Sequence, residues 1–167
     1  TGAYTLVVTP LSGNTPGGDP DDQISEAIAL GSMTQDRILP SGTIDTPTDV
    51  DMFSFTVTAG ERIAFDIDRL SSPGIDSYLR VFDSSGNQLT FNDDAAAPGE
   101  SFTYESYVEY TFRIAGTYFV AASGYGNGSY NPITGAGDTN GSMGGYSLTL
   151  TPMVDILLVV LIIFMAT

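Results

Sequence analysis

The chain has 167 residues and carries twenty acidic residues against five arginines, which gives a net charge of −15. Such a surface repels phosphates, so nucleic acid and anionic lipid headgroups are excluded as partners of that surface. There is no cysteine and no histidine, which rules out disulfides, thiolate metal sites and the usual nucleophilic triads. The acidic residues are scattered among turns and there is no tryptophan, which argues against a carboxylate-pair glycosidase. We therefore predict a protein that is not an enzyme.

Residues 1–10 read as a strand, because Tyr4, Leu6 and Val8 alternate with more polar positions. This opening stretch, GAYTLVVTP from residue 2, nearly repeats GGYSLTLTP at residues 144–152. The similarity suggests the final strand of a preceding copy in a tandem array. It is also consistent with a strand donated to the sheet edge of a neighbouring molecule.

Residues 11–41 are predicted to form a linker that contains one short helix or a turn of one. The segment LSGNTPGGDP is rich in turn formers, and in the following DDQISEAIALG the residues Ile24, Ala27 and Ile28 have helical spacing. Acidic residues precede them, as is favourable at a helix N-terminus, and Gly31 would end the helix.

Residues 42–152 show the two-residue alternation of antiparallel strands, broken by turns rich in glycine, asparagine and aspartate. Alternating stretches occur at 53–57, 63–67, 108–114, 118–122 and 146–151. Strands of this kind, with one buried and one solvated face, pack as two sheets. The predicted fold class is an all-β, antiparallel, jelly-roll-like β-sandwich.

Residues 153–167 form a hydrophobic tail, predicted to be helical, in which 156–166 is an unbroken apolar run. Eleven helical residues extend about 17 Å, short of the ~30 Å of a bilayer core. The tail is therefore either a truncated membrane helix or a contact buried against other protein. We expect self-association or contact with neighbouring repeats through both ends, with membrane contact of the tail left open. The expected assembly residues are Tyr4, Leu6, Val8, Ile156, Leu157, Leu158 and Phe164.

Two groups of carboxylates suggest a Ca²⁺ site. Asp19, Asp21 and Asp22 lie in the linker, and Asp49 and Asp51 lie two apart at the start of a strand, where Val50 would face the other side. Clustered carboxylates repel one another unless a cation lies between them, and Ca²⁺ prefers oxygen ligands. The alternative is that the linker acids only cap the short helix. A further acidic stretch at 91–100 is read as a polar turn rather than a second site.

The order of motifs resembles the bacterial pre-peptidase C-terminal (PPC) domain, whose fold also serves as the collagen-binding domain of clostridial collagenases. The segments are TDVDMFSFTVTAGERIAFDID, DSYLRVFDSSGNQLTFNDD, YTFRIAGTYFVAASG and GGYSLTLTP, spread over roughly residues 19–152. The resemblance implies a secreted bacterial β-sandwich that acts as an accessory module, with calcium shared between linker acids and the Asp49/Asp51 pair.

The tail has a resemblance of its own. LTPMVDILLVVLIIFMAT is similar to the transmembrane helix of the ExbD/TolR family, which would make Asp155 a proton-carrying carboxylate. That family's periplasmic domain does not follow, and its topology would place the sandwich on the cytoplasmic side.

Taken together, the sequence predicts a non-catalytic, extracellular or cell-surface, calcium-binding module that is a structural subunit of a filamentous or surface assembly. One alternative is the substrate-binding accessory domain of a secreted hydrolase. A second alternative is a truncated ExbD/TolR-like proton-channel subunit.

Overall fold

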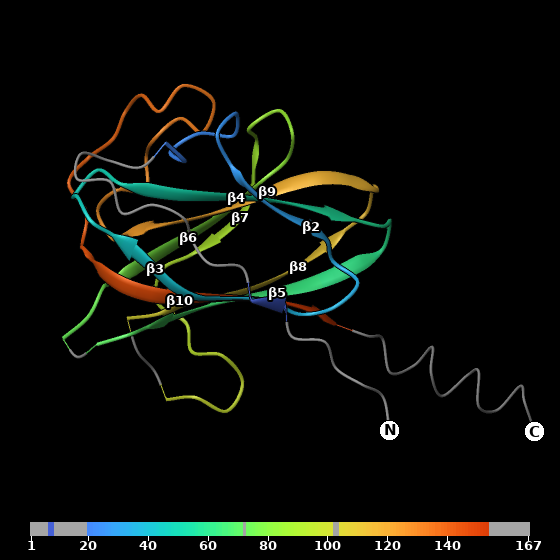
Figure 1. Cartoon of the computed structure of the whole chain (residues 1–167), viewed down its shortest axis with the longest axis horizontal. Coiled ribbons are helices and arrows are strands. Elements are labelled where there is room, and N and C mark those ends of the chain that lie inside the picture. Colours follow the sequence, from blue (N-terminus) through green and yellow to red (C-terminus); the bar gives the residue numbers. More distant parts are fainter. Residues whose placement is uncertain (1–6, 9–19, 72, 102–103, 154–167) are drawn as a thin grey trace, which may run out of the picture.

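The computed structural model describes residues 7–8, 20–71, 73–101 and 104–153. These residues form two five-stranded sheets that stack face to face (Figure 1). Sheet A has the order β1-β3-β10-β5-β8, and sheet B has the order β2-β4-β9-β6-β7. The predicted all-β sandwich is confirmed.

The strand bounds follow the predicted alternation closely in the second half of the chain. Sheet A contains β1 (Val7–Val8), β3 (Arg37–Ile44), β5 (Glu61–Arg69), β8 (Ser106–Phe112) and β10 (Gly144–Met153). Sheet B contains β2 (Ile28–Ser32), β4 (Val50–Val57), β6 (Ser77–Phe82), β7 (Gln88–Asn92) and β9 (Gly116–Gly124). Neighbouring strands are antiparallel except for the β1–β3 and β2–β4 pairs, which are parallel.

The short helix predicted over 21–31 is wrong, and the alternative of a turn is what the chain adopts at residues 24–26. The residues that follow form β2, which pairs with β4 and brings Leu30 into the space between the sheets. Ile24 and Ala27 instead pack on the outer face of sheet B. Burial of all three apolar side chains against a preformed sheet outweighs the weak preference of a short isolated helix.

The main core lies between the two sheets and consists of the inward positions of every long strand. Phe55 of β4 is its centre, with ring centroids 5.5 Å from Phe65 and 5.6 Å from Phe112. These aromatic rings therefore join β4 of sheet B to β5 and β8 of sheet A, and the tilted and edge-on geometries are the favourable ones for such pairs.

A second, smaller core covers part of the outer face of sheet B. It is formed by Val50, Met52, Phe82, Phe119, Ala121 and Tyr130, with Ile24 and Ala27 packed against them. Tyr130 belongs to the long segment 125–143, which folds back over the sheet and meets the segment 20–27 through a hydrogen bond from Ile24 N to Pro132 O of 2.9 Å. Both segments lie at the same end of the sandwich (Figure 1).

Within the described part of the chain, no helix is both long and apolar enough to cross a membrane. The hydrophobic tail predicted for 153–167 lies outside the described residues apart from Met153, which ends β10.

Candidate metal centre

The predicted Asp49/Asp51 pair lies at the start of β4 and is buried, with 4% and 3% of each residue exposed. Because side chains alternate along a strand, Asp51 points inward on the same side as Phe53. Val50 points outward into the second core, as predicted. The pair therefore enters the space between the sheets at one end of the sandwich.

Tyr146 of β10 meets this pair from the opposite sheet. Its side chain is fully buried, and its hydroxyl donates a hydrogen bond to Asp51 Oδ2. Burial raises the pKa of Tyr146 well above its ordinary value, and the charges of Asp51, Asp21 and Asp49 raise it further. Three carboxylates thus lie close enough to act on one phenol.

The linker acids are held beside the same site by backbone hydrogen bonds to β4. Asp21 is 3% exposed, and its carbonyl oxygen accepts a bond of 3.0 Å from Met52 N. Asp22 is partly buried, and its Oδ1 accepts a bond of 3.1 Å from Val50 N. Asp22 therefore ties the linker to a strand instead of capping a helix, while the predicted ligand Asp19 lies outside the described residues.

Hydrogen bonds also hold Asp49 to the segment before it and to the segment 125–143. Asp49 Oδ2 accepts a hydrogen bond of 2.8 Å from Asp45 N. Asn127, whose side chain is fully buried, donates from Nδ2 to Asp49 O at 3.4 Å and accepts at Oδ1 from Thr139 N at 3.0 Å. The segment 125–143 and the acidic pair are thereby joined into one unit.

The chemistry of this donor set fits a hard divalent cation. The three buried carboxylates of Asp21, Asp49 and Asp51 offer only oxygen atoms, which suits Ca²⁺ and not the softer metals that select thiolate or imidazole. Bringing three negative charges into a poorly solvated site is unfavourable unless an opposite charge compensates them.

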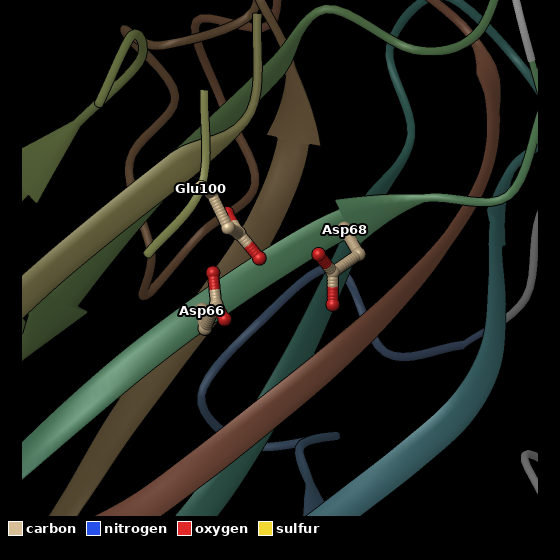
Figure 2. Close-up of side chains that lie close together, drawn as sticks. All are labelled: Asp66, Asp68 and Glu100. Carbon is tan, nitrogen blue, oxygen red and sulfur yellow. The ribbon is translucent and has the colours of Figure 1, made fainter. Parts of the chain in front are cut away.

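A second acidic cluster, which the sequence did not single out, lies on the outer face of sheet A (Figure 2). Asp66 and Asp68 project from β5 toward Glu100, and one carboxylate oxygen of each lies within 4.8 Å of the others. Burial raises the pKa of Asp66 to about 7, and the charges of Asp68, Glu100 and Glu105 contribute. The sequence did contain a signal for this cluster, because the two-residue alternation of the strand places Asp66 and Asp68 on one face of the sheet.

The predicted turn at 91–100 does form, and it presents Glu100 to β5. Glu100 N donates to Ala97 O at 3.0 Å, and Glu100 Oε2 accepts from Ala97 N at 3.3 Å. Glu100 thus closes a polar turn and also contributes one carboxylate to the cluster with Asp66 and Asp68.

Of the predicted assembly residues, only Val8 lies among the described residues. It belongs to β1, whose backbone pairs in parallel with β3 of the same chain, Val8 opposite Ile38. Tyr4 and Leu6, and Ile156, Leu157, Leu158 and Phe164 of the tail, lie outside the described residues, as does Asp155.

Comparison with known proteins agrees with this architecture. Residues 49–124 match the family described as the bacterial pre-peptidase C-terminal domain. A probable subtilase-type serine protease of Deinococcus radiodurans is 35% identical over 109 residues, which is 63% of this chain and 14% of that protein. The chain therefore spans a small part of the length of this relative.

The fold is shared with a solved structure of low sequence identity. The pre-peptidase C-terminal domain of collagenase from Bacillus anthracis has a TM-score of 0.50 at 15% identity, covering 75% of this chain and 94% of that domain. PliG of Aeromonas hydrophila, a periplasmic inhibitor of g-type lysozyme, has a TM-score of 0.47 at 14% identity, over 90% of this chain and 100% of PliG. The comparisons do not support the similarity of the tail to ExbD/TolR. Over residues 49–124, the predicted resemblance to the bacterial pre-peptidase C-terminal domain is confirmed.

Proposed function

We propose that this chain is a non-catalytic, calcium-binding accessory module of an extracellular or cell-surface bacterial protein. The observation that carries the proposal is the burial of Asp21, Asp49 and Asp51, together with the buried Tyr146 that donates a hydrogen bond to Asp51. Two of these aspartates lie in the segment that matches the PPC family, and the third belongs to the linker that precedes it.

Calcium would supply the positive charge that this site needs. The ion takes six to eight oxygen ligands at about 2.3–2.6 Å, so the carboxylates of Asp21, Asp49 and Asp51 would provide part of the set. The hydroxyl of Tyr146 would orient the carboxylate of Asp51 through its hydrogen bond. The linker is already bonded to β4 through Asp21 and Asp22, so calcium would fasten the entry of the chain into the sandwich.

The accessory role is preferred to that of a structural subunit. The Deinococcus relative is named as a protease, and the match covers only 14% of it, which suits a module that accompanies a separate catalytic domain. The subunit role was predicted from the two terminal segments. The one terminal strand that is described, β1, pairs within its own chain.

Thermal unfolding with and without calcium tests the proposal. We expect calcium to raise the midpoint of the wild-type chain relative to EDTA, with the increase growing with the logarithm of free calcium above the dissociation constant. Asp51→Asn should lose this increase, because it removes a central carboxylate. Asp36→Asn is the matched control, since it changes one exposed carboxylate outside both acidic clusters and should keep the increase.

Isothermal titration of the same three proteins with CaCl₂ gives the independent measurement. Binding to the wild type and to Asp36→Asn, with none to Asp51→Asn, supports the assignment. An unchanged melting midpoint in EDTA, or full binding by Asp51→Asn, would rule it out.

A further inference from the structure

Three aromatic side chains lie together on the outer face of sheet B, and we call them the aromatic patch: Tyr78, Phe91 and Tyr125. The rings of Tyr78 on β6 and Phe91 on β7 are stacked, with centroids 5.7 Å apart and planes 21° from parallel. Phe91 is 50% exposed and Tyr125 is 56% exposed. Large aromatic side chains that remain together in water are a common mark of an interaction surface.

The second core covers the neighbouring part of this face and stops at the patch. Gly128 of the segment 125–143 lies against the ring of Tyr78, where a β-carbon would come within 2.8 Å of the ring. The segment thus forms a wall on one side of Tyr78. On the other side the sheet ends at β7, an edge strand of sheet B, so an extended peptide can approach along Phe91.

Three carboxylates surround the aromatic patch, and we call them the acidic rim: Asp76, Asp93 and Asp94. Tyr125 N donates to Asp76 O at 2.7 Å, which places Asp76 beside the patch. The pKa of Asp76 is raised by burial and further by the charges of Asp94 and Asp93. The pKa of Tyr78 is likewise raised by burial, and the charge of Asp93 adds to it. In the turn after β7, Asp93 therefore lies close to both Asp76 and Tyr78, and Asp94 lies close to Asp76.

Two arginines offset only part of this negative charge: the charge of Arg69 acts to lower the pKa of Asp76, and that of Arg80 acts to lower the pKa of Tyr78. Arg80 is 9% exposed, and it donates to Gln88 Oε1 at 2.6 Å and to Tyr130 O at 2.9 Å, within the second core. Arg69 pairs with Glu105, with an N–O distance of 3.5 Å. Both arginines thus have partners outside the rim, and three aspartates remain beside the exposed aromatic rings.

We propose that the aromatic patch and acidic rim bind an extended basic segment of another protein, with arginine side chains stacked on Tyr78 and Phe91 and paired with Asp93 and Asp94. Guanidinium groups are attracted to aromatic faces and form bidentate pairs with carboxylates. The chain itself shows the first contact, because the guanidinium of Arg80 lies 4.6 Å from the ring centroid of Phe82 and 4.5 Å from that of Tyr130. The site is separate from the proposed calcium site and does not depend on it.

Titration with a decapeptide of five Gly-Arg repeats tests the proposal, with tyrosine fluorescence and calorimetry as readouts because the chain has no tryptophan. The matched ligand is the same peptide with citrulline, which keeps the shape and removes the charge. We expect the arginine peptide to bind and the citrulline peptide not to bind. Phe91→Ala and Asp93→Asn should each weaken binding about tenfold, as expected for one lost contact of roughly 1.4 kcal/mol.

Two control variants lie outside the patch. Ile133→Ala removes another exposed apolar side chain, and Asp36→Asn removes another exposed carboxylate; both should bind like the wild type. Binding should also be the same in calcium and in EDTA, so a failed calcium proposal leaves this result unaffected.

Three outcomes would overturn the proposal. Equal loss in Asp36→Asn and Asp93→Asn would show attraction to the acidic surface in general. Equal binding of the citrulline peptide would show that charge is not recognised. Sedimentation that shows self-association of the chain, abolished by Phe91→Ala, would assign the patch to a second copy instead.

Discussion

Tyr146 is the residue on which the fold and the candidate metal centre meet. It lies on β10 in the middle of sheet A, and its hydroxyl reaches the carboxylate of Asp51 on sheet B. The ring occupies the space in which the residue paired with it on β3 would place a side chain. That residue is Gly42, and a β-carbon added to it would lie 2.4 Å from the ring of Tyr146. The glycine in β3 is therefore a packing requirement of the tyrosine.

Gly42→Ala should destabilise the chain by about 1–3 kcal/mol, the usual cost of adding a methyl group to a packed interior. Urea unfolding followed by circular dichroism measures this change. Gly116→Ala is the matched control, since its nearest neighbour would be 3.9 Å away, and it should leave the midpoint almost unchanged. A Gly42→Ala variant as stable as the control would show that Tyr146 can move without cost.

Asp66 should make stability depend on pH. Its pKa is about 7 in the folded chain and 3.8 as an ordinary carboxyl, so between these values the folded state holds more protons than the unfolded state. The free energy of unfolding therefore falls as pH rises from about 4 to 7. Above about pH 7 the loss is complete, because Asp66 is then ionised in both states. Asp66→Asn should be more stable than the wild type at pH 8 and should equal it more nearly at pH 5.

The measurement is urea unfolding of both proteins at pH 5 and pH 8 in EDTA, where calcium does not interfere. Parallel pH profiles for the two proteins would contradict the assignment of the shift to Asp66. The side chain is only partly buried, and solvent screening keeps the effect small.

The candidate metal ligands could be named from the sequence because the aspartates cluster at two places, in the predicted linker and at the start of a predicted strand. Asp19, Asp21, Asp22, Asp49 and Asp51 were named from their clustering in the sequence and from the family resemblance, and the structure buries Asp21, Asp49 and Asp51. The contribution of Glu100 to the second cluster was not predictable, because it depends on how a turn 30 residues later folds across β5. Tyr146 gave only a strand signal in the sequence, since nothing local indicates a partner 95 residues away.

At the scale of elements, the strands with strict alternation were predictable, and β2, β3 and β7 were not. β3 contains Pro40 and Gly42, which break the pattern, and its pairing with β10 is irregular between Tyr146 and Leu148. β7 is a five-residue edge strand with only two large apolar residues. β2 was read as helical because its apolar spacing suits either structure, and only contact with β4 decides between them.

The segment 125–143 contains many glycine, asparagine and serine residues, but the second core holds it in place. Arg80→Ala should release it, because the guanidinium between Phe82 and Tyr130 and its bond to Tyr130 O would be lost. Hydrogen exchange of amides 125–143 should accelerate by at least tenfold while exchange in β5 and β10 stays slow. Arg62→Ala, which removes an exposed surface pair with Glu109, is the control and should change neither region. Unchanged exchange in Arg80→Ala would mean that the apolar contacts alone hold the segment.

At the scale of the whole molecule, the net charge is −15 and there is no lysine. Folding brings these negative charges closer together, and their mutual repulsion destabilises the folded state. Added NaCl should therefore raise the melting midpoint in EDTA, because the Debye length falls from about 10 Å at 0.1 M to 3 Å at 1 M. Differential scanning calorimetry at 0.05, 0.2 and 1 M NaCl checks this, and KCl should give the same result. A midpoint that is constant or falls with salt would show that the acids are already compensated in the folded chain.

The fold class was predictable from alternation, and the pairing of strands was not. Period-two patterning fixes which face of each strand is buried, but it carries no information on which strand is the neighbour. The placement of β10 between β3 and β5 is a consequence of long-range packing that no local stretch encodes.

That placement governs when the sandwich can form. β10 is the last strand among the residues that the structure describes, yet it is the middle strand of sheet A, paired with β3 on one side and β5 on the other. A chain that is still being synthesised and ends before residue 144 lacks both this strand and Tyr146, so β3 and β5 have no strand between them. Pairing between strands so distant in sequence is slow to nucleate, so sheet A can close only after Gly144–Met153 has become available to pair.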